Sequence, residues 1–200
     1  RKLTLKSEST HTNVLGILLN GGQSRRMRTD KGMLSINGLT NVDRVHALLS
    51  RCQVTEVITS GQQANSIADL YPQGGPLSGI LSVIVKKRPS AVMVVPIDMP
   101  LLTSGAINAL INQGLAHQKA CCYESYSLPV FIPVTDLLID TLTGEFESDR
   151  YQQDGKGPSF RYLMSKIGCH YLPAVDSQEL INTNTPQEWD NAVKCLQQRP

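Results

Sequence analysis

The sequence predicts an α/β fold in which a mostly parallel sheet is covered by helices on both faces. Short apolar runs alternate along the chain with amphipathic segments of helical periodicity, and no internal repeat interrupts the alternation. The length of 200 residues suits one self-supporting domain. We therefore expect residues 13–200 to form a single domain, preceded by a polar extension over residues 1–12.

The individual elements follow from the same patterns. The continuous apolar run NVLGILLN is typical of a buried strand, and apolar residues three or four apart between Val42 and Leu49 are typical of a helix. Pro76 suits the first turn of a helix, and Thr103 or Ser104 suits an N-cap. In chain order we expect strands at 13–20, 54–60, 91–96, 120–123 and 128–132, a short extended segment at 33–36, and helices at 40–52, 76–87, 103–117, 158–167 and 185–195.

Composition narrows the range of partners. A net charge of +2, without a long run of one sign, gives no default attraction to nucleic acid or to a membrane surface. No apolar run approaches the roughly 20 residues that span a bilayer. The five cysteines show neither a CxxC spacing nor a Cys/His ligand pattern, so we expect reduced thiols in a cytoplasmic protein without structural zinc. Nucleic acid and membranes are therefore not expected as partners.

A glycine-rich, basic loop follows the first predicted strand. Gly21 and Gly22 leave backbone N–H groups open to a ligand, and Ser24, Arg26 and Lys31 add a hydroxyl group and positive charge. This combination suits a triphosphate, although composition alone also allows a solvated basic turn. The G-x-x-x-x-G-K-[ST] and G-x-G-x-x-G patterns are both absent, which disfavours a P-loop protein and a nicotinamide-dependent oxidoreductase.

Asp98 lies between Pro96 and Pro100, directly after the strand expected at 91–96. Ligands of parallel sheets collect at the carboxyl ends of the strands. Mg²⁺ bound to a triphosphate takes one or two carboxylates in addition to phosphate oxygens. The alternative is an N-cap for the next helix, but Thr103 and Ser104 already suit that end. We expect Asp98 to hold Mg²⁺.

Three motifs resemble those of one enzyme family. Residues 19–31 read LNGGQSRRMRTDK, residues 69–79 contain D-x-x-P and G-P-L-S-G, and residues 182–186 read N-T-N-T-P. Together they resemble the molybdenum cofactor guanylyltransferase (MobA) family of nucleotidyltransferases, and the resemblance spans residues 14–195. It implies a three-layer Rossmann-like nucleotidyltransferase fold. Asn20 and Arg28 stand where the family pattern has alanine and glycine, and arginine adopts positive φ less readily than glycine.

The resemblance also implies roles for particular residues. The backbone from Leu19 to Gly22 would embrace the nucleotide, and Lys31 would contact its phosphates. Asp69 would recognise guanine, since a carboxylate accepts the hydrogens of both N1 and N2. Arg26 is expected to neutralise the leaving pyrophosphate, and Ser60 to line the base pocket. The expected nucleotide-binding residues are Leu19, Asn20, Gly21, Gly22, Lys31, Ser60, Asp69, Gly75, Pro76, Leu77 and Asp98; the catalytic residues are Arg26, Lys31 and Asp98; and the acceptor-binding residues are Asn182, Asn184 and Arg161.

The activity implied by the resemblance is transfer of GMP from GTP to molybdopterin or the molybdenum cofactor, with Mg²⁺ and with release of pyrophosphate. Other molybdenum-cofactor proteins are further candidate partners. Two alternatives stay open. One is the same chemistry with CTP or another phosphorylated acceptor. The other is a relative that binds a nucleotide without turnover, suggested by Arg28 and by Leu128, which stands where relatives carry a histidine-proline or similar pair.

Overall fold

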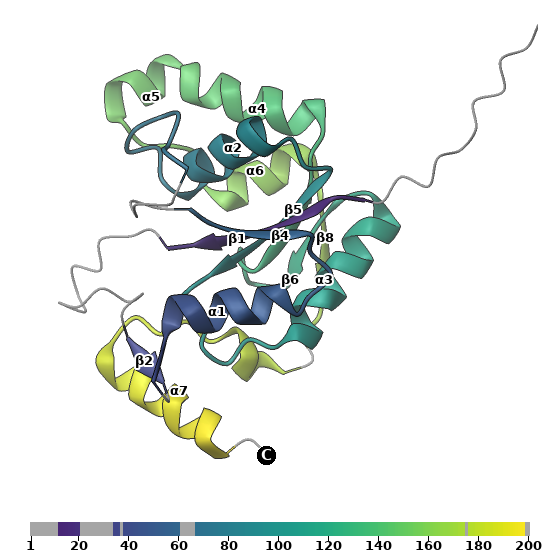
Figure 1. Ribbon diagram of the computed structural model, residues 1–200. Coiled ribbons are helices and arrows are strands. Elements are labelled where there is room, and N and C mark those ends of the chain that lie inside the picture. The colour runs from purple at the N-terminus through teal and green to yellow at the C-terminus, as the bar shows by residue number, and fades with distance from the viewer. Residues whose placement is uncertain (1–11, 21–33, 37, 61–66, 175, 199–200) are drawn as a thin grey trace, which may run out of the picture.

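The computed structural model describes residues 12–20, 34–36, 38–60, 67–174 and 176–198 (Figure 1). The elements in chain order are β1 (Val14–Leu19), β2 (Ser35–Ile36), β3 (Leu39–Thr40), α1 (Asn41–Ser50), β4 (Glu56–Ser60), α2 (Pro76–Lys87), β5 (Ala91–Pro96), α3 (Ser104–His117), β6 (Ala120–Tyr123), β7 (Val130–Pro133), α4 (Asp136–Glu147), α5 (Asp149–Asp154), α6 (Phe160–Ile167), β8 (Cys169–Leu172), the 3₁₀ helix η2 (Ser177–Leu180) and α7 (Pro186–Gln198).

The central sheet has six strands in the order β4-β1-β5-β7-β6-β8. The pairs β1–β4, β1–β5 and β6–β8 are parallel, and β7 is antiparallel to both of its neighbours. Reversal of this one strand leaves the other five pointing the same way, so their carboxyl ends share one edge. The β1 arrow in Figure 1 points to that edge. The predicted mostly parallel sheet is confirmed.

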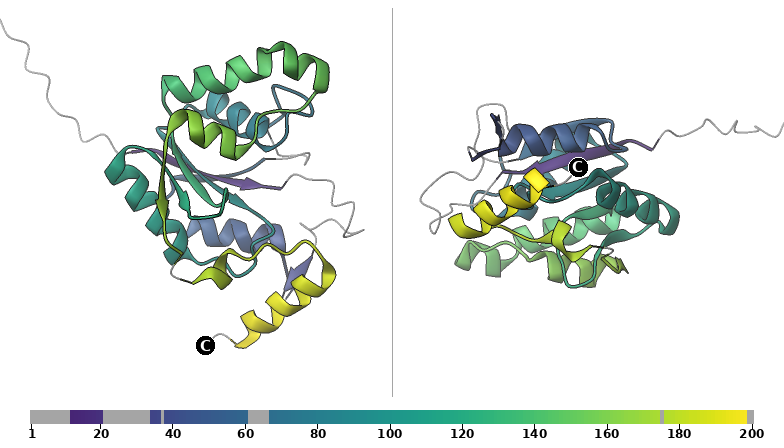
Figure 2. Two further views of the ribbon diagram at one scale, coloured as in Figure 1. Left: turned by 180° about the vertical axis from the view of Figure 1, so that it is seen from behind. Right: turned by 90° about the horizontal axis from the view of Figure 1, so that it is seen from below.

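Helices cover both faces of this sheet and bury two separate cores. In Figure 1, α2, α4 and α6 lie above the sheet and α1 and α3 below it, and the reversed view in Figure 2 keeps the same layers. Strand β1 serves both cores because its side chains alternate between the two faces. Leu15 and Ile17 join the α2, α4 and α6 side, while Val14 and Leu18 join the α1 and α3 side. This is the predicted three-layer arrangement.

Local capping explains where several helices begin. Thr103 Oγ1 accepts a hydrogen bond from Ala106 N at 3.2 Å, so α3 begins at the next residue. At α7, Thr185 Oγ1 accepts from Glu188 N at 3.2 Å while Glu188 Oε2 accepts from Thr185 N at 2.9 Å. This reciprocal pair is a capping box that fixes the start of the last helix.

Several elements differ from the sequence-based expectation. Helices α4 and α5, strand β8 and η2 were not predicted, although α4 buries Leu138, Leu142 and Phe146 at a spacing of four. Ile181, which precedes the N-T-N-T-P motif, follows η2 rather than a strand. Within the part of the chain that the structure describes, none of the helices is both long and apolar enough to cross a membrane.

Candidate active site

Three strand ends meet at the carboxyl edge of the sheet. Asn20 N donates to Ser60 O at 3.0 Å, which ties the residue after β1 to the last residue of β4. Ile97 N donates to Leu19 O at 3.3 Å, which ties the residue after β5 to the last residue of β1. The expected residues Leu19, Asn20 and Ser60 therefore lie together. Gly21, Gly22, Arg26, Arg28 and Lys31 lie outside the described residues, so their expected roles stay predictions.

Asp98 is held through the two peptide groups that flank its Cα atom. Asn41 Nδ2, from the first turn of α1, donates to Ile97 O at 2.5 Å. From the other side of the turn, Thr183 donates to Asp98 O twice, from its backbone N at 2.8 Å and from Oγ1 at 3.2 Å. Asn41 and Thr183 are each only 1% exposed, whereas the Asp98 side chain is partly exposed. The turn presents a carboxylate at the surface on a fixed backbone.

Arg44 fixes the orientation of Asn41. Its Nη2 donates to Asn41 Oδ1 at 3.2 Å, so the amide group of Asn41 directs Nδ2 towards Ile97 O. Burial lowers the pKa of the Arg44 guanidinium below its ordinary value. Among the described residues, the buried Nε of Arg44 has no hydrogen-bond partner. Arginine nevertheless keeps its charge in proteins, so a cation stands two hydrogen bonds from the peptide before Asp98.

Asp69 lies at the other end of the same edge, beside β4 and α2. A Cβ atom on Gly79 would overlap Ser60 Oγ and would come within 3.2 Å of Asp69 Oδ1, so both side chains converge on this helical glycine. Burial raises the pKa of the Asp69 carboxyl above its ordinary value. The structure thus brings together Ser60, Asp69 and the start of α2, three parts of the expected base pocket.

Two buried serines of α2 hold the segment that carries Asp69. Ser82 Oγ accepts from Leu70 N at 2.8 Å and donates to Ser78 O at 2.7 Å. Ser78 Oγ accepts from Tyr71 N at 3.2 Å and donates to Tyr71 O at 2.8 Å. The serine hydroxyl groups replace the backbone partners that this non-helical segment lacks where it lies against α2.

The start of α2 offers backbone rather than side chains. Gly75, the N-cap residue, has φ 75° and ψ −164°, a conformation that is essentially confined to glycine. Pro76 follows at the first helical position, and Leu77 is 1% exposed in the core. Any contribution of Leu77 to nucleotide binding therefore comes from its backbone.

The expected acceptor residues fall in two different layers. Asn182 and Asn184 are exposed on either side of the buried Thr183, as expected for an extended segment, and so stand next to Asp98 O. Asn184 N also donates to Glu188 Oε2 at 2.6 Å. Arg161 is exposed on α6, whose buried residues belong to the core on the opposite face of the sheet. The structure brings the asparagines to Asp98 but not Arg161.

The donor set fits a metal that arrives with the nucleotide. Among the described residues, no group of three or more His, Cys, Asp or Glu side chains could hold a metal ion without further ligands. Mg²⁺ in nucleotide sites is typically bound by one or two carboxylates and by substrate phosphates. Asp98, completed by the phosphate oxygens of a bound nucleotide, would meet that requirement.

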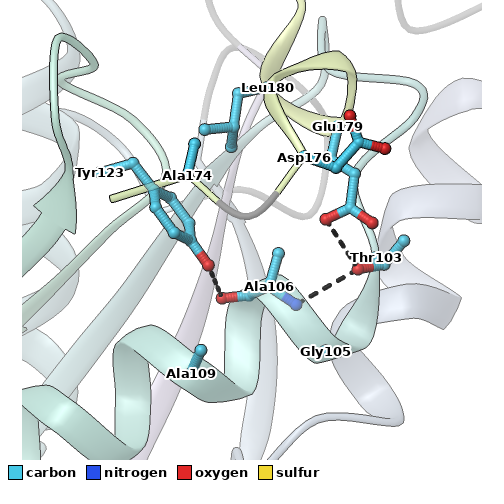
Figure 3. A pocket seen from close by; sticks show the side chains of 9 residues that line it. All are labelled: Thr103, Gly105, Ala106, Ala109, Tyr123, Ala174, Asp176, Glu179 and Leu180. Atoms are coloured by element: carbon cyan, nitrogen blue, oxygen red, sulfur yellow. Dashed lines mark hydrogen bonds between the residues drawn. The ribbon is translucent and has the colours of Figure 1, made fainter. Parts of the chain in front are cut away.

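A hollow of about 240 Å³ lies between the first turns of α3, Tyr123 of β6 and η2 (Figure 3). Thr103 Oγ1 donates to Glu179 Oε2 at 3.2 Å across it, and Tyr123 Oη donates to Ala106 O at 2.9 Å. Burial first, and then the charge of Glu179, raise the pKa of Tyr123 to about 12. The hollow is lined by Thr103, Gly105, Ala106, Ala109, Tyr123, Ala174, Asp176, Glu179 and Leu180. Its two carboxylates disfavour an anionic phosphate group.

The fold and the site define a nucleotidyltransferase: a mostly parallel sheet carries a glycine-rich basic sequence directly after β1 and an aspartate directly after β5. Residues 16–155 match the family model of the MobA-like NTP transferase domain. The chain belongs to this family, which confirms the family predicted from the three motifs.

Relatives match over nearly the whole chain. The molybdenum cofactor guanylyltransferase of Xanthomonas euvesicatoria pv. vesicatoria (strain 85-10) is 30% identical over 183 residues, covering 89% of this chain and 93% of that protein. The molybdenum cofactor guanylyltransferase of Shewanella amazonensis is 26% identical over 200 residues, covering 91% and 96%.

Solved structures share the fold. The molybdopterin-guanine dinucleotide biosynthesis protein A of Archaeoglobus fulgidus superposes with a TM-score of 0.71 at 18% identity, covering 92% of this chain and all of that one. CMP:2-keto-3-deoxy-manno-octonic acid synthetase complexed with CTP gives a TM-score of 0.65 at 11% identity, covering 93% and 99%. The same architecture therefore serves different bases, and the base must be read from individual residues.

Proposed function

We propose that this chain is a molybdenum cofactor guanylyltransferase, which transfers GMP from GTP to molybdopterin or the molybdenum cofactor and releases pyrophosphate. The names of the full-length relatives support this acceptor. The observation that carries the proposal is the placement of two aspartates at one sheet edge, Asp69 beside the end of β4 and Asp98 after the end of β5, with β1 between them. A nucleotide following β1 would have its base near Asp69 and its phosphates near Asp98.

The chemistry requires placement and charge rather than a protein nucleophile. A terminal phosphate oxygen of the acceptor attacks the α-phosphorus in line, the new P–O bond forms, and the bond to pyrophosphate breaks. The attacking oxygen is already anionic near neutral pH, so no strong base is needed. Arg26, Lys31 and the N–H groups of Gly21 and Gly22 would neutralise the departing charge. A Mg²⁺ ion held by Asp98 would add Lewis-acid stabilisation of the phosphates.

Asn182 and Asn184 are proposed to contact the acceptor because both flank Thr183, which binds Asp98 O. Arg161 is also proposed to contact an acceptor phosphate. This contact requires the acceptor to reach α6, on the opposite face of the sheet from Asn182 and Asn184. We also propose that residues 13–200 form a single domain from which residues 1–12 extend. We propose that the protein works in the cytoplasm, where its free thiols stay reduced. Other molybdenum-cofactor proteins are proposed as partners there.

One alternative has a specific observation in its favour. The fold is shared with an enzyme complexed with CTP, so a cytidylyltransferase activity is compatible with the architecture. Asp69 favours guanine over cytosine, because cytosine lacks the pair of neighbouring N–H donors that a carboxylate would take from guanine.

The test is thermal unfolding with Mg²⁺ and each of GTP, CTP, UTP and ATP, because a specific ligand stabilises the folded state by mass action. GTP should give the largest rise in Tm, and equal rises for all four would refute the guanine assignment. Pyrophosphate release from GTP in the presence of molybdopterin then tests the acceptor. Lys31→Ala should abolish this release while keeping the Tm without nucleotide.

A further inference from the structure

The buried polar side chains of this protein concentrate on two short segments. Five polar residues are buried in the described part of the chain: Asn41, Ser60, Ser78, Ser82 and Thr183. A buried polar group is costly unless it is hydrogen-bonded, so such groups mark places where the backbone must be fixed. Here they lie against the turn that carries Asp98 or against the segment that carries Asp69.

We propose that these residues form two separate positioning sets for the reaction. Asn41 and Thr183 position Asp98 and thereby set the Mg²⁺ dependence, while Ser78 and Ser82 position Asp69 and thereby set the preference for guanine. The inference rests on the proposed function for the roles of the two aspartates. It adds four residues that touch neither substrate nor metal.

The first set fixes both peptide planes around the Cα atom of Asp98. Ile97 O belongs to the peptide before it and is bound by Asn41, and Asp98 O belongs to the peptide after it and is bound twice by Thr183. Rotation of either plane would break one of these bonds. Because a metal site tolerates displacements of only about 0.5 Å, holding both planes is what keeps the carboxylate in place.

The second set fixes the peptide that follows Asp69. Leu70 N donates to Ser82 Oγ, and Tyr71 is bound through both its N–H and its carbonyl by Ser78 Oγ. Both serines lie on α2, the helix whose Gly79 is approached by Asp69 Oδ1. The segment and the helix therefore move as one unit, and the carboxylate keeps its place relative to the base pocket.

The hydrogen bonds of both sets are already directed to the protein itself. Ser82 Oγ accepts from Leu70 N and donates to Ser78 O, and Thr183 Oγ1 donates to Asp98 O. The hydroxyl protons are thus committed to backbone carbonyls. These residues act through the aspartates rather than through contact with a ligand.

The test compares two variants in one pair of binding measurements. Thr183→Val removes a hydroxyl donor and keeps the side-chain shape, and Ser82→Ala leaves Leu70 N without its acceptor. Calorimetry of GTP binding across a Mg²⁺ titration gives the half-saturating Mg²⁺ concentration, and the ratio of Kd values for ITP and GTP reports the guanine 2-amino group, which ITP lacks. No acceptor is needed, so a wrong acceptor assignment does not affect the result.

Thr183→Val should raise the half-saturating Mg²⁺ concentration about tenfold with the ITP:GTP ratio unchanged, because one hydrogen bond to a fixed carbonyl is lost. Ser82→Ala should lower the ITP:GTP ratio about tenfold with the Mg²⁺ requirement unchanged. Thr183→Ser restores the hydroxyl and should restore the native Mg²⁺ requirement. Asn41→Ala should reproduce the effect of Thr183→Val and serves if that variant folds poorly.

Thr135→Ala is the matched control. Thr135 Oγ1 caps α4 by accepting from Leu138 N at 3.2 Å, and it follows β7 at the opposite edge of the sheet. This variant should lower Tm and leave both binding readouts unchanged. The inference is overturned if Thr183→Val and Ser82→Ala shift both readouts together, or if they lower only Tm as Thr135→Ala does. If the native protein binds ITP as tightly as GTP, the role of Asp69 in reading guanine is refuted, and the positioning role of Ser78 and Ser82 is refuted with it. The Mg²⁺ titration still tests the positioning of Asp98 by Asn41 and Thr183.

Discussion

Gly79→Ala probes the close approach of the base pocket to α2. The new Cβ atom would overlap Ser60 Oγ and lie 3.2 Å from Asp69 Oδ1, in a place where Ser60 is only 5% exposed and has little room to move. Alanine gains about 1 kcal/mol over glycine inside a helix, whereas overpacking a closed site costs roughly 1–3 kcal/mol. The expected net loss in the free energy of unfolding is therefore about 0–2 kcal/mol.

Gly144→Ala supplies the reference for this experiment. Gly144 lies inside α4, and a Cβ atom there would have nothing within 4 Å, so only the gain in helix propensity remains. For a protein of this size each kcal/mol shifts Tm by about 2–4 °C. Thermal unfolding should rank Gly144→Ala above the native protein and Gly79→Ala below it.

The functional result of Gly79→Ala separates it from a simple loss of stability. Displacement of Asp69 should shrink the additional rise in Tm that GTP gives over CTP, whereas Gly144→Ala should keep it. A Gly79→Ala protein as stable as Gly144→Ala, with the preference for GTP intact, would refute the reasoning that Ser60 and Asp69 are packed against this glycine to read the base.

Three further predictions concern charged residues of the proposed site. Asp98→Asn should keep the native Tm and lose Mg²⁺-dependent pyrophosphate release, since it removes the charge near the metal but not the shape; release at ordinary Mg²⁺ concentrations would place the ion elsewhere. Burial raises the pKa of Asp69, so the ionised carboxylate lowers the free energy of unfolding. This loss of stability is fully present above the raised pKa and disappears below the ordinary value of 3.8. Asp69→Asn should therefore raise Tm slightly at neutral pH, by an amount that vanishes in acid, and GTP binding to the native protein should weaken as the pH falls through the raised pKa. Arg28→Gly should leave pyrophosphate release nearly unchanged if Arg28 points away from the loop backbone. If the native protein releases no pyrophosphate and the Arg28→Gly variant does, the arginine distorts the loop.

The parts of the fold that local pattern determines were predictable. Helix α2 and strands β5 and β6 match their expected bounds, because proline in the first helical turn and continuous apolar runs are local signals. Strand β8 was missed because its sequence, CHYL, is short and half-buried, and it becomes a strand only by pairing with β6 at the edge of the sheet. Helix α4 was missed although its spacing of buried residues was available in the sequence.

The site residues likewise divide into those that the local sequence predicted and those that it did not. Asp98 stood out because two prolines bracket an aspartate after a strand, which folding alone explains poorly. Thr183 and Asn41 did not, because burial of a polar residue is a tertiary property that neither residue reveals locally. Ser78 and Ser82 carried a usable signal, since they are two hydroxyl residues four apart in the otherwise apolar helix PLSGILSVIV.

The arrangement of charge explains why two aspartates need such firm support. A triphosphate is repelled by carboxylates, so under the proposed function the site would have to keep Asp69 near the base and confine Asp98 to the metal that the phosphates share. Strand β1 lies between the ends of β4 and β5 and provides this separation. Arg44 adds a permanent cation that is linked through Asn41 to the peptide before Asp98. A carboxylate that drifted towards the phosphates without its metal would oppose binding, and fixing the backbone on both sides of Asp98 prevents that drift.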